Sequence, residues 1–409
     1  MGDQVGAIDQ TARFEPADLY ASPNALAAHY RDFRVAERLL LTGHSHQAWP
    51  DVARRGLELA WRDAADQVDD KWDRARERAD RVRRGYARLL DDGDGLYALA
   101  SSVHDLIVRL LSALPLSERP RVVTTDAEFY SFERQLRRLE EEGIEAVRVA
   151  AEPAESIGER MAQALCERTA MAYLSTVFFE NGLIAGGLGE LVAACRRIDV
   201  PLVLDVYHHL NVVPFSLPAH GLEDAFVVGG GYKYCQLGEG NCFLRFPADC
   251  EMRPAVTGWF AAFGSLTDQP SGKVLYDAGH NRFAGATYDP VSHYRGAEVF
   301  DFFDQHELTV ELLREVSQHQ IGLLIERFDD LDLDPRTIAR ETATPLDRLG
   351  GFLALDSPRA GDIHAGLRER GVLTDFRGTT LRLGPAPYLS DQQLRDAVGL
   401  LGAVVRGLE

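Results

Sequence analysis

Five short runs of aliphatic and β-branched residues alternate with helical stretches through the first half of the chain. The runs are VVTTDA (122–127), AVRVA (146–150), AYLSTVFF (172–179), PLVLDVY (201–207) and AFVVGG (225–230). Runs of this composition suit strands that are buried on both faces of a sheet. The stretches between them, such as 131–143 and 187–199, have the spacing of amphipathic helices. This alternation predicts an α/β fold with a parallel sheet and right-handed crossovers.

The segments that flank this alternation have different sequence patterns. Residues 51–90 are rich in arginine and acids with apolar residues at helical spacing, which predicts a pair of solvent-facing helices. GNCFLRF (240–246) follows a short turn that contains glycine, so we expect it to pair antiparallel to the preceding strand. We divide the chain into an N-terminal arm (1–50), a large domain (51–290), and a connecting long helix with a small C-terminal α+β domain (291–409).

Composition and charge limit the partners of the chain. Its formal net charge is −19, and 45% of its 409 residues are hydrophobic, which is enough for a large core. A negative field opposes binding to nucleic acid or to an anionic membrane, so we expect a small-molecule partner. No signal peptide and no apolar run of about eighteen residues is found, which favours a cytoplasmic protein. The five cysteines form no CxxC pair and are expected to be reduced.

One lysine stands in an unusual setting. The chain has only three lysines, and Lys233 lies between two tyrosines directly after three glycines, in GGGYKYCQLGEG (229–240). Asp205 ends one predicted strand and Lys233 lies just beyond the next, at the sheet edge where open parallel sheets bind ligands. A lysine with a lowered pKa can form a Schiff base, and an aspartate can hold a protonated pyridine nitrogen. Pyridoxal phosphate (PLP) requires this pairing.

Each of these features also has a plainer interpretation. A strand-terminal aspartate is usually a helix cap or an ion-pair partner, and a lysine is usually solvated. Gly229–Gly231 could belong to a dinucleotide-binding loop, but that fingerprint opens the first strand–helix unit, whereas this run ends a late strand. A metal site made from His44, His46, His208 and His209 would lack an acid or thiol at ligand spacing, so we expect no metal.

Two segments around this lysine resemble kynureninase, a PLP enzyme of fold type I in the aminotransferase class V superfamily. They are DVYHHLNVVPF (205–215) and FVVGGGYKYCQLGEGNCFLRF (226–246), which match the family patterns D-x-x-H and Y-K-Y. The resemblance extends, with decreasing precision, from about residue 40 to the C-terminus. It implies a mostly parallel seven-stranded sheet flanked by helices, a small α+β domain, and a homodimer with active sites shared between the subunits.

The resemblance also implies roles for single residues. Lys233 would hold the cofactor covalently and move the substrate α-proton, Asp205 would bind the pyridine nitrogen, and Tyr232 would reach the phosphate and take part in proton transfer. Arg382 would clamp the substrate carboxylate, since its planar fork suits that group. The remaining implied contacts are Ser101, Ser102, Phe129, Ser131, His208, Trp259 and Thr287 for the cofactor, with His44 and Ser45 at the active-site entrance.

Some of these residues have other interpretations. Phe129 and Trp259 could be core aromatics. Arg382 and Arg377 could be surface ion-pair partners, and Arg282 is a further candidate for a carboxylate.

The chain departs from the family where the substrate would bind. Phe132 takes the place of an aspartate, His44 replaces an asparagine, and Ala261–Phe263 follow the G-W-F motif where the family has Gly-His. Residues 286–290 read Ala-Thr-Tyr-Asp-Pro in place of an N-P-P-like segment. These changes affect recognition of an anthraniloyl group more than cofactor chemistry.

The favoured function is therefore that of a PLP enzyme acting on an L-amino acid, by kynureninase-like hydrolytic cleavage of the Cβ–Cγ bond of a kynurenine-type substrate. A β-eliminating C–S lyase and an aminotransferase share the early steps and are alternatives. A catalytically quiet binding protein that kept the fold is the non-enzymatic alternative.

Overall fold

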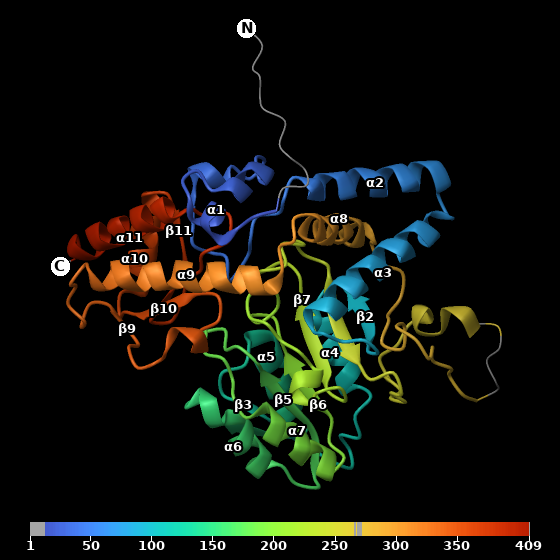
Figure 1. Cartoon of the computed structure of the whole chain (residues 1–409). Coiled ribbons are helices and arrows are strands. Elements are labelled where there is room, and N and C mark those ends of the chain that lie inside the picture. Colours follow the sequence, from blue (N-terminus) through green and yellow to red (C-terminus); the bar gives the residue numbers. More distant parts are fainter. Residues whose placement is uncertain (1–12, 266, 268–271, 409) are drawn as a thin grey trace.

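The centre of the protein is a seven-stranded sheet, seen in a computed structural model that describes residues 13–265, 267 and 272–408 (Figure 1). Its strand order is β2-β8-β7-β6-β5-β3-β4. The strands are β2 (Leu96–Ala100), β3 (Arg121–Thr125), β4 (Glu145–Val149), β5 (Thr169–Ser175), β6 (Leu202–Asp205), β7 (Phe226–Gly230) and β8 (Cys242–Phe246). Within this sheet only β8 runs antiparallel to its neighbours. The expected mostly parallel sheet and the antiparallel pairing of residues 240–246 are both confirmed.

Helices cover both faces of this sheet, which explains why its central strands are mostly apolar. Alternate residues of a strand point to opposite faces, so Val203 packs against the side of α4 (Val103–Leu111) and α5 (Tyr130–Glu140). Its neighbour Leu204 packs on the other side, against the core that includes α6 (Ile157–Ala164) and α7 (Leu188–Arg197).

The predicted pair of charged helices is also confirmed. It consists of α2 (Val52–Gln67) and α3 (Lys71–Leu89), which pack on α8 (Val291–Gln305) beside the sheet (Figure 1). Gly56 lets α2 approach α8 closely, because a Cβ there would lie 2.6 Å from the carbonyl oxygen of Tyr294.

The helical region after residue 290 is two helices, whereas the sequence predicts one long connecting helix. α8 ends at Gln305, and α9 (Val310–Asp329) begins after a turn in which Glu307 has a φ of +50°. The side chain of Thr309 accepts a hydrogen bond from the backbone nitrogen of Leu312 and so caps α9. A left-handed residue followed by an N-cap ends one helix and starts another.

The C-terminal region forms the expected small α+β unit. A four-stranded antiparallel sheet has the order β12-β13-β10-β9. Its elements are β9 (Ala339–Arg340), β10 (Leu353–Asp356), α10 (Ala360–Glu369), β12 (Asp375–Arg377), β13 (Thr380–Leu383) and α11 (Asp391–Arg406).

The N-terminal segment joins this small unit. After α1 (Pro16–Tyr20), strand β1 (Leu39–Leu40) pairs in parallel with β11 (Val372–Leu373). The backbone nitrogen of Gly43 then donates to the carbonyl oxygen of Gly384, at 2.7 Å. Within the described ranges, no helix has the length and apolar character needed to cross a membrane.

Candidate active site

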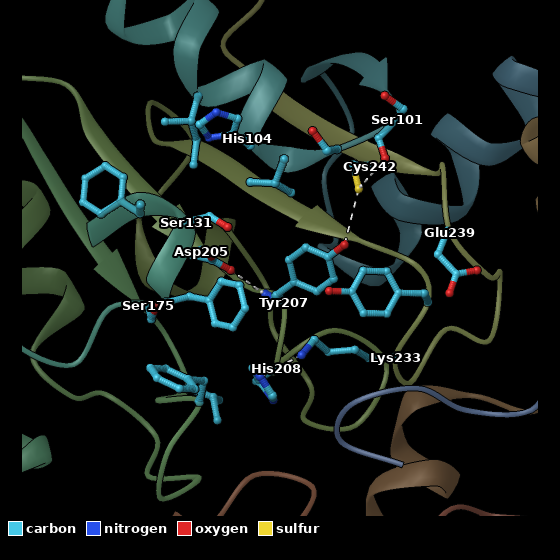
Figure 2. A pocket seen from close by; sticks show the side chains of 18 of the residues that line it. Ser101, His104, Ser131, Ser175, Asp205, Tyr207, His208, Lys233, Glu239 and Cys242 are labelled. Carbon is cyan, nitrogen blue, oxygen red and sulfur yellow. Dashed lines mark hydrogen bonds between the residues drawn. The ribbon is translucent and has the colours of Figure 1, made fainter. Parts of the chain in front are cut away.

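A cavity of about 200 Å³ lies at the carboxyl ends of β5, β6 and β7 (Figure 2). This volume far exceeds the ~15 Å³ that one water molecule needs, so the cavity suits a small-molecule ligand. Eight of the residues expected at the cofactor line it: Ser101, Ser102, Phe129, Ser131, Asp205, His208, Tyr232 and Lys233. They come from segments more than 100 residues apart in the sequence, which the parallel sheet brings to one edge.

Lys233 is a buried amine in the wall of this cavity. Its Nζ lies 2.9 Å from Nε2 of His208, and Figure 2 marks this contact with a dashed line. Burial and the nearby Arg382 guanidinium lower the pKa of Lys233 from 10.5 to about 7, against the opposing effect of Asp205. A large share of the side chain is therefore free amine at neutral pH, as a nucleophilic lysine requires.

The glycines before Lys233 make room for two side chains that pack on the end of β7. A Cβ at Gly230 would overlap the hydroxyl of Tyr207, and a Cβ at Gly231 would lie 2.5 Å from a methyl group of Leu237. The backbone nitrogen of Leu237 also donates to the carbonyl oxygen of Gly231 at 2.8 Å, which closes the turn that carries the lysine. The close approach of Tyr207 and Leu237 thus explains Gly230 and Gly231.

Asp205 is buried and held by two donors. Its Oδ1 accepts a hydrogen bond from the backbone nitrogen of Tyr207, and its Oδ2 accepts one from the hydroxyl of Tyr173, both at 2.9 Å. Burial raises the pKa of Asp205, whereas these two hydrogen bonds and Lys233 favour the ionised form. A carboxylate oxygen accepts more than one hydrogen bond, so Asp205 can also bind a donor inside the cavity.

The N-terminus of α4 forms another part of the cavity wall. Ser102 caps the helix, since its Oγ accepts a hydrogen bond from the backbone nitrogen of Asp105 at 3.2 Å. Ser101 donates to Oδ2 of Asp105 at 3.0 Å. A helix N-terminus offers free N–H groups and a positive dipole end to an anion such as a phosphate.

The sequence did not single out Glu128, which lies one residue before Phe129. Its Oε1 accepts hydrogen bonds from the Thr125 hydroxyl (2.7 Å) and the Ser175 nitrogen (3.2 Å), and its Oε2 accepts one from the Ser175 hydroxyl (2.5 Å). Burial raises the pKa of Glu128 to about 7, although these hydrogen bonds oppose the shift. The only sequence signal was an acid at the end of a buried strand.

The lining residues that were not assigned a role from the sequence include Tyr207, Phe179 and Cys242. The Tyr207 hydroxyl lies 3.3 Å from the sulfur of Cys242 (Figure 2). Burial raises the pKa of Cys242 to about 11, so its thiol is protonated at neutral pH. All five cysteines of the chain are free thiols.

Arg382 and His44 lie behind the cavity wall and meet at Asp375. Arg382 donates through Nε to Oδ1 of Asp375 at 2.7 Å and through Nη1 to the carbonyl oxygen of Phe179. Nε2 of His44 lies 3.4 Å from the same Asp375 oxygen. Arg377 also reaches Asp375, at 3.3 Å. Burial acts to raise the pKa of Asp375, but hydrogen bonds and charge from His44 and Arg382 hold it below its usual range. Arg382 is therefore occupied by protein partners in this state.

The other predicted residues lie outside the cavity. Nε1 of Trp259 donates to the Thr287 hydroxyl at 3.2 Å, and Trp259 is 43% exposed. Ser45 contacts Nδ1 of His46 at 3.2 Å, and Arg282 donates to the carbonyl oxygen of Met252 at 3.1 Å. Across the described ranges, no group of three or more histidine, cysteine or acidic side chains is arranged to hold a metal ion.

Comparison with known proteins gives sequence relatives and structural neighbours. No protein-family model matches the chain. The chain is 24% identical over 311 residues to a kynureninase of Bacillus cereus, covering 70% of this chain and 67% of the relative. It is 23% identical over 309 residues to a kynureninase of Bacillus mycoides, with the same coverage. The resemblance to kynureninase is thus confirmed.

Solved structures with a similar fold include C-DES with its PLP cofactor and a cysteine desulfurase. A mutant of C-DES with glycine covalently linked to its PLP cofactor matches with a TM-score of 0.76 at 16% identity, covering 92% of this chain and 98% of the other. A cysteine desulfurase from Thermococcus onnurineus also matches with a TM-score of 0.76, at 13% identity, covering 94% of this chain and 98% of the other. These likenesses confirm the expected architecture of PLP fold type I.

Proposed function

We propose that this chain is a PLP-dependent enzyme that acts on an L-amino acid. One observation carries the proposal: Lys233, with a pKa near 7, and the buried carboxyl of Asp205 line the same cavity at the carboxyl end of a parallel sheet. These are the two groups that PLP chemistry requires from a protein.

The other lining residues fit the remaining parts of PLP. Ser101, Ser102 and the N-terminus of α4 would hold the phosphate, with Tyr232 as a further donor. Phe129 is 39% exposed although it lines the cavity, so its ring is available to stack on the pyridine ring, with Ser131 nearby. When bound, PLP withdraws electrons from the substrate α-carbon.

Lys233 would hold the cofactor and move the α-proton of the substrate. When Lys233 is in the ammonium form, its Nζ donates to Nε2 of a neutral His208, whose Nδ1 is buried without a hydrogen-bond partner. A neutral His208 accepts a charge-assisted hydrogen bond from the ammonium form of Lys233 and a weaker, neutral one from the free amine. Burial and Lys233 lower the pKa of His208, which keeps the imidazole neutral in this exchange.

Arg382 is our candidate for the residue that binds the substrate carboxylate. It lies behind Phe179, whose side chain lines the cavity, and Asp375 holds its guanidinium. Carboxylate binding would exchange one of these protein partners for the substrate. Arg377 contacts Asp375 at the same place, and His44 and Ser45 lie on the segment that leads to it.

Kynureninase-like hydrolytic cleavage of a Cβ–Cγ bond is the favoured reaction, because the curated relatives are kynureninases and the D-x-x-H and Y-K-Y segments match. A β-eliminating C–S lyase is comparably supported. The solved neighbours include the cystine C-S lyase C-DES with cysteine persulfide, and Phe132 replaces the aspartate expected near a kynurenine-type substrate. An aminotransferase or a catalytically quiet protein would also keep the fold.

Two measurements test the proposal. Purified protein supplied with PLP should gain a visible absorption band, and borohydride followed by peptide mass spectrometry should place the adduct on Lys233. No band and no adduct would refute cofactor binding and favour the binding-protein alternative. Incubation with kynurenine, 3-hydroxykynurenine and S-substituted cysteines then separates the reactions, since alanine reports hydrolytic cleavage whereas pyruvate and ammonia report β-elimination.

The expected homodimer is part of the proposal. The segment around Trp259 exposes apolar rings that a second copy could cover: Trp259, Phe263 and Tyr288 are 43%, 45% and 41% exposed. Light scattering during size-exclusion chromatography should give twice the chain mass, and Trp259→Ser should weaken the association.

A further inference from the structure

Tyr173 is a buried phenol that the proposed chemistry does not otherwise use. It lies on β5 with 1% of its surface exposed, and its ring stacks on Phe132 of α5 at 3.7 Å between centroids and 13° between planes. Its hydroxyl donates to Oδ2 of Asp205 at 2.9 Å. The stacking fixes the ring and thereby the direction in which the hydroxyl points.

The hydrogen bond from Tyr173 completes the support of Asp205. Oδ1 is held by the backbone nitrogen of Tyr207, and Oδ2 is held by Tyr173, so each carboxylate oxygen has one fixed donor. Two donors on opposite oxygens set the plane of the carboxylate. The remaining acceptor capacity of Asp205, which lines the cavity, is available to a ligand.

We propose that Tyr173 is a positioning residue that holds Asp205 ionised and oriented to pair with the pyridine nitrogen of the cofactor. This inference rests on the proposed function. Burial favours the neutral acid, whereas a hydrogen bond donated to a carboxylate favours the charged form.

Several other titratable groups are electrostatically coupled to Asp205, and their effects on its ionisation must be distinguished from that of Tyr173. They are Lys233, Glu128, Tyr232 and Cys242. Burial raises the pKa values of Tyr232 and Cys242, so both groups are neutral around pH 7. Lys233 and Glu128 both have pKa values of about 7, so Glu128 needs a control variant.

The test is the pH dependence of PLP affinity in the full chain, measured by absorbance titration of cofactor-free protein. Tyr173→Phe removes only the hydroxyl, and we expect PLP to bind about tenfold more weakly at neutral pH, in line with the loss of a hydrogen bond to a charged group. Because the pKa of Asp205 rises without this donor, the fall in affinity on the acid side should move to higher pH. A purely structural role would weaken binding at every pH alike.

Two controls make the result specific. Tyr97→Phe, on β2, removes a hydroxyl that donates at 2.6 Å to Asp92, whose side chain is 5% exposed, and should leave PLP affinity unchanged. Glu128→Gln removes the competing titration, and the shift caused by Tyr173→Phe should persist in that background.

A double-mutant cycle decides whether Tyr173 acts through Asp205. In an Asp205→Asn background, Tyr173→Phe should cause no further loss of affinity. An equal tenfold loss in both backgrounds, or an unchanged pH profile in Tyr173→Phe, would overturn the inference while leaving PLP binding by the unmodified chain intact. Failure of the unmodified chain to bind PLP would instead refute the proposed function.

Discussion

The buried amine of Lys233 makes a quantitative prediction about stability. Its pKa falls from 10.5 in the unfolded chain to about 7 in the folded protein. A tenfold change in an acid dissociation constant corresponds to about 1.4 kcal/mol, so burying the ammonium form costs roughly 5 kcal/mol. Below pH 7 the folded and unfolded states are both protonated and the full cost is present. Between about pH 7 and 10 the unfolded chain binds more protons, so stability rises with pH.

The substitution Lys233→Met should remove this pH dependence. We expect the cofactor-free variant to be more stable than the unmodified protein at pH 6, and this advantage to shrink by up to roughly 5 kcal/mol as the pH approaches 10. Urea unfolding at a series of pH values measures the difference. Lys71→Met is the matched control, because Lys71 is a surface lysine that donates to the carbonyl oxygen of Val68. Parallel stability curves for Lys233→Met and the unmodified chain would refute the buried, depressed amine.

Three further predictions concern single residues. The pKa of Glu128 is raised from 4.5 to about 7, so the free energy of unfolding should fall as the pH rises between these values. Glu128→Gln should remove about 3 kcal/mol of this fall, measured by urea unfolding. An unchanged dependence of unfolding free energy on pH would contradict the prediction. Gly230→Ala should displace Tyr207, lower the free energy of unfolding by about 1–3 kcal/mol and weaken PLP binding in absorbance titrations. Unchanged thermal unfolding and PLP binding would show that the glycine is dispensable. Arg382→Gln should raise KM for the amino-acid substrate about tenfold or more with the visible band of PLP kept, whereas the exposed Arg336→Gln should leave KM unchanged. A normal KM in Arg382→Gln would move the carboxylate site elsewhere.

The strands of the large domain were predictable because each is marked by the composition of its own short sequence run. Strands buried on both faces are mostly apolar, so the runs that include β5 and β6 stand out in the sequence. The pairing of Asp205 with Lys233 followed, since parallel strands bring their carboxyl ends to one edge. β2 was not predicted as a strand, because Leu96–Ala100 (LYALA) has no β-branched residue and pairs with the distant β8.

What the sequence could not supply depends on contacts between distant segments. Glu128 gains its raised pKa only when Ser175 and the core surround it, and neither neighbour is visible in DAEFYSF. The occupation of Arg382 by Asp375 likewise follows from the hairpin of β12 and β13. The break between α8 and α9 depends on the left-handed conformation of Glu307, for which a glutamate gives no signal.

The segment from β1 to Gln47 connects the small C-terminal unit to the loop that carries Lys233. One end is bonded to the small unit through β11 and Gly384, and the backbone nitrogen of Gln47 donates to the carbonyl oxygen of Tyr232, next to the lysine. Rotation of the small unit would therefore pull on the peptide that carries Lys233. In the proposed function, binding of the substrate carboxylate at Arg382 would therefore be coupled through this segment to the placement of Lys233.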